Sequence, residues 1–229
     1  MRDDRAAKEP SIDWVQVPEI SRPWLSIPLE DYERHMSAVE VGQLPVLAEL
    51  FWSVLERWRP KSVAIVGVAG GNGLEAIDPS ITKRIVGVDI NQQYLDKVEQ
   101  RFGRLAGLEL HRCDVTIRAP KLPPTGLVHA ALLFEHTGLD LALDNVLSLV
   151  APGGILSVVL QLPSAEAKDV ATTKYTSLQS VKQQFALIDI AGFRLEMTSR
   201  GFQMIDEDKR PLPAGKAFWL GLFARSSDR

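Results

Sequence analysis

Short apolar segments alternate with amphipathic segments from residue 61 onward, and this alternation constrains the fold more than any other feature. Amphipathic patterns typical of helices cover 91–104, 138–150 and 177–190. Strands separated by helices of this length form βαβ units around a parallel sheet, so we expect an α/β fold. The segments with the apolar composition of strands are 63–66, 84–89, 108–113, 127–134, 155–161, 193–198 and 216–225.

The N-terminal part has a different character. Three prolines make residues 1–27 an irregular arm, and a short helix is expected from Pro28 to Met36 because proline and acidic residues favour a first turn. Apolar residues from Leu47 to Trp58 recur at helical spacing and predict a helix over 43–58 with one buried stripe. We therefore expect an arm and helical cap over 1–60, followed by a domain over 61–229.

Composition argues against several classes of function. Twenty-six Lys plus Arg against 29 Asp plus Glu give a net charge of −3, so no uniform basic field supports a nucleic-acid partner. One cysteine and four scattered histidines show no metal-ligand spacing, so no metal is expected. The charged N-terminus and the lack of a long apolar run predict a cytoplasmic protein that does not enter a membrane.

Four glycines follow the first predicted strand, at Gly67, Gly70, Gly71 and Gly73. Glycine lets backbone amides approach a ligand closely, and a helix N-terminus directly behind the loop would add partial positive charge. A tight turn without a ligand is the alternative, but four glycines in seven residues exceed what such a turn needs. The loop therefore predicts a ligand site.

One candidate ligand is a dinucleotide. Gly67, Gly71 and Gly73 satisfy the G-x-x-x-G-x-G spacing of short-chain dehydrogenases, which would make the protein an NAD(P)-dependent oxidoreductase. Those enzymes also require a Tyr-x-x-x-Lys pair. No tyrosine of this chain has a lysine four positions later, and this weakens the oxidoreductase hypothesis.

Acidic residues stand at the ends of the next two predicted strands. Asp89 follows the second strand, where a carboxylate can accept hydrogen bonds from both hydroxyls of a ribose. Capping of the helix that starts near Asn91 is the alternative role for Asp89. Asp114 ends the third strand, where contact with a ligand and a role in a solvated turn are equally plausible.

Three patterns in this order resemble class I S-adenosylmethionine-dependent methyltransferases. They are the G-x-A-x-G of Gly67, Ala69 and Gly71, the acid Asp89, and the L-x-P-G-G-like segment from Leu149 to Gly154. The resemblance covers residues 61–225. It implies a Rossmann-like three-layer α/β/α sandwich whose seven-stranded sheet is mostly parallel, with one antiparallel strand at the C-terminus and an N-terminal helical extension.

The resemblance also implies S-adenosylmethionine as cofactor and a set of cofactor-binding positions. One departure is Ile65, which stands where the family usually has Asp or Glu, and Glu75 is a possible substitute. A non-catalytic module that only binds the cofactor is therefore a second alternative. The implied cofactor-binding residues are Gly67, Ala69, Gly70, Gly71, Asn72, Gly73, Asp89, Ile90, Asp114, Val115, Phe134 and Glu135.

Methyl transfer needs few catalytic groups, because the sulfonium already carries an electrophilic methyl. His136 and His35 are the candidate bases, since imidazole titrates near neutrality, although packing or surface roles are equally plausible. His111, His129 and Cys113 are assigned to structure.

The substrate signals are mostly negative. The Asp/Asn-Pro-Pro-aromatic motif of enzymes that methylate nucleic-acid amino groups is absent after the fourth strand. We expect a small organic acceptor, with the tryptophan-rich cap and the 162–176 stretch as a lid, in a monomer or homodimer.

Overall fold

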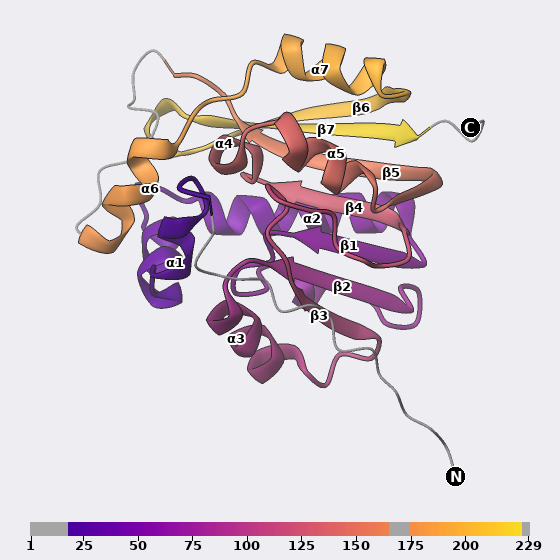
Figure 1. Ribbon diagram of the computed structural model, residues 1–229, viewed down its shortest axis with the longest axis horizontal. Coiled ribbons are helices and arrows are strands. Elements are labelled where there is room, and N and C mark those ends of the chain that lie inside the picture. Colours follow the sequence, from indigo (N-terminus) through magenta and orange to yellow (C-terminus); the bar gives the residue numbers. More distant parts are fainter. Residues whose placement is uncertain (1–17, 165–174, 226–229) are drawn as a thin grey trace.

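The structure is a computed structural model that describes residues 18–164 and 175–225. One seven-stranded sheet runs through it in the order β3-β2-β1-β4-β5-β7-β6 (Figure 1). Only β7 is antiparallel to its neighbours, so six strands run in one direction and the predicted topology is confirmed. The strands are β1 (Ser62–Val66), β2 (Arg84–Asp89), β3 (Leu108–Arg112), β4 (Thr125–Ala131), β5 (Val150–Gln161), β6 (Phe202–Pro211) and β7 (Ala217–Arg225).

Alternating side chains of the central strands fill two separate cores. Val63 and Ile65 of β1 point to the face covered by α2 (Gln43–Trp58) and α3 (Gln92–Phe102). Ala64 and Val66 point to the opposite face, which α5 (Asp140–Leu147) and α7 (Ile190–Ser199) cover. The molecule is therefore a three-layer α/β/α sandwich, as expected.

Helix α2 buries the predicted stripe against the sheet. Leu50, Phe51 and Val54 are each at most 2% exposed. The prediction that Trp58 belongs to this buried stripe is wrong, because its side chain is 37% exposed and lies beside the Arg57 guanidinium at the helix end. The helix then stops at Arg59, whose φ of 43° lies in the left-handed region.

The remainder of the cap lies at the end of the sheet where the parallel strands finish. It comprises the 3-10 helix η2 (Arg22–Leu25) and α1 (Leu29–Ser37), which begins after Pro28 as predicted. Figure 1 shows α1 close to α6 (Gln179–Gln184) at this end. The Ser177 hydroxyl of η4 (Thr176–Leu178) donates to the Asp31 carboxylate at 2.7 Å. Residues 1–17 of the predicted arm lie outside the described residues.

Three predicted elements are wrong in the C-terminal half. Residues 193–198 belong to helix α7, whose start is capped by the Asp189 carboxylate accepting from the Gly192 amide at 2.8 Å. The sixth strand is instead β6, within a segment whose polar composition suggested a loop. The helix predicted to reach Ile190 ends at Gln184.

The fourth strand also ends earlier than predicted, at Ala131, and a helical turn, α4 (Phe134–Thr137), follows it. Helix α5 ends at Leu147 and β5 already begins at Val150, so the paired glycines lie within the strand, and the predicted turn before a strand starting at 155 is wrong. Gly153 has a φ of 69° where the pairing of β5 with β4 shifts register, a conformation that glycine adopts readily.

The helix expected directly behind the glycine loop is absent. Only the 3-10 turn η3 (Leu74–Ala76) follows the loop, and residues 77–83 form no helix before β2 begins. The Glu75 carboxylate accepts from the Gly73 amide at 3.1 Å within this turn.

A short 3-10 helix, η5 (Pro213–Gly215), precedes β7. Among the residues that the structure describes, no helix is long and apolar enough to cross a bilayer.

Candidate functional site

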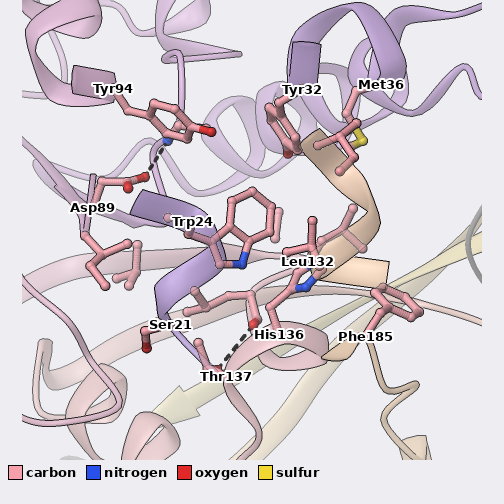
Figure 2. Close-up of a pocket in the computed structure, with 18 of the residues that line it drawn as sticks. Ser21, Trp24, Tyr32, Met36, Asp89, Tyr94, Leu132, His136, Thr137 and Phe185 are labelled. Atoms are coloured by element: carbon pink, nitrogen blue, oxygen red, sulfur yellow. Dashed lines mark hydrogen bonds between the residues drawn. The ribbon is translucent and has the colours of Figure 1, made fainter. Parts of the chain in front are cut away.

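A cavity of about 170 Å³ opens at the carboxyl ends of the parallel strands. Loops after β1, β2, β3 and β4 form its floor, and the cap and α6 form its roof (Figure 2). Ligands of doubly wound sheets bind at this edge. Its wall comprises Ile20, Ser21, Trp24, Tyr32, His35, Met36, Val41, Gln43, Val66, Gly67, Ala69, Val88, Asp89, Ile90, Tyr94, Cys113, Asp114, Val115, Ala131, Leu132, Leu133, His136, Thr137, Gln161, Leu178, Val181, Lys182, Phe185 and Lys216.

The loop after β1 presents backbone to this cavity. The amides of Gly67 and Val68 both donate to the Val88 carbonyl, at 2.8 and 3.1 Å, and this fixes the loop to β2. Ala69 has a φ of 46°, a conformation that costs energy for any residue other than glycine. Leu132, also in the wall, has a φ of 52°. Such strain is typical of ligand sites.

The other loop residues assigned to the cofactor face the helices instead. A Cβ on Gly71 would lie 2.8 Å from the Phe102 ring, and one on Gly73 would lie 2.9 Å from Phe51. The Asn72 side chain donates to the Leu44 carbonyl at 3.0 Å. These residues let the loop pack against α2 and α3, and they do not line the cavity.

Gly70 is held from outside the cavity by an ion pair. The Arg101 guanidinium donates to the Gly70 carbonyl at 3.0 Å and to the Glu33 carboxylate at 2.9 Å. Because Glu33 belongs to α1 and Arg101 to α3, this contact connects the cap, the glycine loop and helix α3.

Asp89 lies at the wall of the cavity with its carboxylate held by two amides. Its Oδ2 accepts from the Ala69 amide at 2.9 Å, and its Oδ1 accepts from the Asn91 amide at 2.9 Å. Burial raises the pKa of this carboxyl to about 6, against the opposing effect of these hydrogen bonds. The cap of α3 is Asn91, whose side chain accepts from the Gln93 amide. The Ile90 amide also acts on the Asp89 carboxylate through a hydrogen bond, and of the four lone pairs on the two oxygens at least one remains for a ligand.

Asp114, Ile90 and Val115 lie in the same wall. Asp114 Oδ1 accepts from the amide and the hydroxyl of Thr116, at 2.9 and 2.6 Å, as expected for a turn residue. Its Oδ2 is buried without a hydrogen-bond partner. Both roles considered from the sequence are therefore open to this residue, because one oxygen serves the turn and the other is an unused acceptor.

The α4 turn separates two predicted cofactor residues from the cavity. Phe134 is fully buried against Phe193, with ring centroids 5.8 Å apart. Glu135 is 1% exposed, and its Oε1 accepts from the Gln161 amide at 2.7 Å. Burial raises the pKa of Glu135 to about 7. Neither side chain lines the cavity, because the turn points them into the sheet core and directs the following residues outward.

His136 and Thr137 take that outward position. The His136 ring lies edge-on to Trp24 and Phe185, with centroids 4.8 and 5.3 Å away, and its Nδ1 is buried without a partner. Burial lowers the pKa of His136 to about 4, so the imidazole is neutral near pH 7. In Figure 2, Trp24 lies between Asp89 on one side and His136 on the other.

His35, the second candidate base, lines the cavity from α1. Burial lowers its pKa, and Lys182 and Lys216 lower it further. His129 packs in the core, where Nδ1 lies 2.9 Å from the Ser157 hydroxyl. Cys113 is 5% exposed and, although assigned only to structure, forms part of the wall.

Several wall residues escaped the sequence analysis. Lys182, Phe185 and Lys216 come from α6, the loop after it and the approach to β7, far along the chain from the strand ends. No local pattern distinguishes them. Of the proposed lid, residues 165–174 lie outside the described residues. Within the described residues, no group of three or more His, Cys, Asp or Glu side chains could hold a metal ion.

Comparison with known proteins gives a fold and no close relative. No family model matches the chain, and no curated protein matches it. A solved structure of magnesium protoporphyrin IX methyltransferase from Synechocystis PCC 6803 with bound S-adenosylhomocysteine superimposes with a TM-score of 0.66, at 14% identity, over 90% of this chain and 98% of that one.

A second similar structure is the N-methyltransferase NodS from Bradyrhizobium japonicum WM9 in complex with S-adenosylhomocysteine. Its TM-score is 0.60 at 13% identity, and the match covers 86% of this chain and 97% of that one. A putative sarcosine dimethylglycine methyltransferase from Galdieria sulphuraria has a TM-score of 0.61 at 11% identity, over 80% and 86% of the two chains. The chain therefore has the Rossmann-like fold of class I S-adenosylmethionine-dependent methyltransferases.

Proposed function

We propose that this protein transfers a methyl group from S-adenosylmethionine to a small organic acceptor. The observation that carries the proposal is Asp89, whose carboxylate is held by the Ala69 amide of the glycine loop and still faces a cavity. A carboxylate in this position suits the two hydroxyls of a ribose. The similar solved structures with bound S-adenosylhomocysteine support the same cofactor.

The residues present fit the rest of the nucleoside. Asp114 Oδ2 is a buried acceptor without a partner, which suits the amino group of adenine. Ile90 and Val115 provide apolar wall beside it. The family pattern has an acidic residue at the position of Ile65. Ile65 packs in the core with α2 and does not line the cavity, so it cannot take over the role of that acid.

The cofactor would supply the electrophilic methyl, and the chain has to position a nucleophile and exclude water. Trp24 and Phe185 enclose His136 in an apolar environment. In the tautomer with its proton on Nε2, the neutral imidazole can accept a hydrogen bond at Nδ1 from the acceptor's O–H or N–H and so orient the nucleophile. A pKa of about 4 makes His136 a weak base, so orientation is its main contribution.

Two alternative functions have less support. An NAD(P)-dependent oxidoreductase lacks support because none of the tyrosines has a lysine four positions later. A non-catalytic module would bind S-adenosylmethionine without transferring the methyl. The cytoplasmic location, the small organic acceptor and the monomeric or homodimeric state remain predictions.

Calorimetric titration of the purified protein tests the proposal. S-adenosylmethionine and S-adenosylhomocysteine are expected to bind in the micromolar range, at least tenfold more tightly than NAD or ATP. Equal affinity for all four would overturn the proposal. Binding without methyl transfer to any of a broad panel of phenols, amines and carboxylic acids would favour the non-catalytic module.

A further inference from the structure

The cavity has an acidic end and a basic end. Asp89 and Asp114 lie where β2 and β3 finish, and no other Asp or Glu among the described residues lines the wall. At the other end, Lys182 of α6, Lys216 before β7 and His35 of α1 contribute to the wall. The charges are thus separated along the cavity, with the ring of His136 in the wall as well.

The basic side chains converge on one region. After burial itself, the charges of Lys182 and Lys216 are the main causes that lower the pKa of His35, and the Glu40 carboxylate acts in the opposite direction with a smaller effect. Both ammonium groups therefore lie close enough to His35 to act on it through space. Lys216 is only 8% exposed. A cation in such a water-poor place attracts an anion more strongly than an exposed lysine does.

The wall around these groups is apolar. Leu178 and Val181 are buried on the same short helical segment as Lys182, and Phe185 lies beside His136. A ligand that fits this region has an apolar or aromatic body and a negatively charged group.

Building on the proposed methyl transfer, we infer that the acceptor is an apolar or aromatic acid whose carboxylate or phosphate group binds at Lys182 and Lys216. His35 adds a neutral hydrogen-bonding group at this end. The acid's nucleophilic O–H or N–H then faces His136, between the basic end and the cofactor end. The charge on the acceptor, and not the shape of the cavity alone, selects the substrate.

A competing explanation assigns the same lysines to the carboxylate of the cofactor's methionine moiety. The two explanations differ in what the lysine variants lose. If the lysines serve the acceptor, their removal leaves the affinity for S-adenosylhomocysteine unchanged. If they serve the cofactor, that affinity falls.

The test measures binding of matched probes by calorimetry, with and without saturating S-adenosylhomocysteine. The probes are benzoate against benzamide, 4-hydroxybenzoate against 4-hydroxybenzamide, and phenyl phosphate against benzyl alcohol. We expect at least one acid to bind tenfold or more tightly than its neutral partner. Lys182→Met and Lys216→Met are expected to reduce this preference about 10- to 100-fold, the range for losing a charged hydrogen-bond partner.

Controls separate binding from folding. Lys97→Met removes an exposed lysine on α3 and should change nothing. Lys216→Arg keeps the charge if Lys216→Met unfolds, and thermal unfolding of each variant shows which variants are folded. In both lysine variants the affinity for S-adenosylhomocysteine should stay within twofold of wild type.

Three results overturn the inference. The first is equal binding of acids and neutral partners, and the second is an acid preference that survives both lysine substitutions. The third is a tenfold loss of S-adenosylhomocysteine affinity in a folded lysine variant, which assigns the lysines to the cofactor. Failure of the proposed function is distinct, because then the wild-type protein does not bind S-adenosylhomocysteine, while the acid probes are still measured without it.

Discussion

At the residue scale, the proposed function makes the affinity for the ribose depend on the protonation state of the Asp89 carboxyl. An ionised carboxylate accepts from both hydroxyls, whereas a protonated one loses an acceptor. Because burial raises the pKa of Asp89 to about 6, the ionised form is lost at a higher pH than for an exposed acid. We expect the affinity for S-adenosylhomocysteine to be constant from pH 7 to 8 and to fall progressively below pH 6.

Asp89→Asn is expected to lower that affinity by roughly 1 to 3 kcal/mol at pH 7.5 and to remove its pH dependence. Calorimetry between pH 5 and 8 measures both. Asp96→Asn, which changes an exposed carboxylate on α3, is the matched control. Wild-type affinity in Asp89→Asn would end the ribose assignment.

Glu135 carries a different prediction, about stability. Its folded pKa of about 7 lies above the ordinary value of about 4.3 for an unfolded chain. Between these values the folded state binds more protons, so the free energy of unfolding falls as the pH rises from about 4 to 7 and stays low above pH 7. Its Oε2 is buried without a partner, which agrees with an unfavourable ionised form.

Glu135→Gln removes the charge and keeps an oxygen that can accept from the Gln161 amide. We expect this variant to be more stable than wild type by about 3 to 4 kcal/mol at pH 8 and indistinguishable at pH 4. Urea unfolding at several pH values measures the difference, with the exposed Glu49→Gln as control. A gain that is the same at every pH would contradict the mechanism.

At the element scale, the glycine loop depends on close packing as much as on ligand contact. Gly71 and Gly201 have similar φ values, 84° and 78°, but a Cβ on Gly71 would lie 2.8 Å from Phe102, whereas nothing lies within 4 Å of one on Gly201. Substitution by alanine costs left-handed strain at both positions and steric overlap only at Gly71.

Gly71→Ala is therefore expected to lose about 1 to 3 kcal/mol more stability than Gly201→Ala. Chemical unfolding of the two variants gives the difference directly. Equal losses would mean that α3 moves away at little cost, and the loop would then not be fixed by its packing.

The elements that could be predicted from sequence are those with a strong internal pattern. The first two strands are continuous apolar runs that are buried almost throughout, and the helix over 43–58 buries its predicted stripe except for Trp58. Residues 193–198 alternate apolar and polar side chains like a strand, but Leu195 is 72% exposed and the segment is helical after the Asp189 cap. Strand β6 is an edge strand with mostly exposed side chains, held by pairing with β7, so its own sequence gives little signal.

The residues of the candidate site likewise fall into those that the sequence predicts and those that it does not. Asp89, Asp114 and the backbone at Gly67 follow directly from strand ends, and the cavity includes all three. Phe134 and Glu135 were assigned by position after the fourth strand, and a single helical turn changed which side chains face outward. Lys182 and Lys216 required the packing of distant segments, which sequence spacing does not contain.

At the scale of the whole molecule, the cap and the sheet share one core. Leu50, Phe51 and Val54 of α2 belong to the same buried cluster as Val63 and Ile85 of the sheet. Burying five such side chains contributes on the order of 10 kcal/mol, comparable to the entire stability of a domain. We therefore expect α2 and the sheet to unfold as one unit across the predicted boundary at residue 60; Met36 of α1 belongs to the same cluster.

Two truncated chains test this arrangement. A chain of residues 61–229 is expected to lack a cooperative thermal transition, because the α2 face of the sheet is exposed. A chain of residues 43–229 retains α2 and is expected to unfold cooperatively, at a lower temperature than the full chain. Circular dichroism during heating distinguishes them. Cooperative unfolding of residues 61–229 would instead support an independent domain from residue 61.

The bare 3-10 turn behind the glycine loop affects which nucleotides the protein can select. Proteins that hold a pyrophosphate commonly direct a row of helix amides at it, and here the chain provides only Leu74–Ala76 in that place. Arg101, whose guanidinium donates to the Gly70 carbonyl, is already paired with Glu33, so the turn offers a doubly negative linkage few helix amides, whereas a nucleoside joined to a sulfonium has no such group to neutralise. We therefore expect the shortened turn to disfavour dinucleotides by withholding an attraction, a form of selectivity that requires no additional side chain.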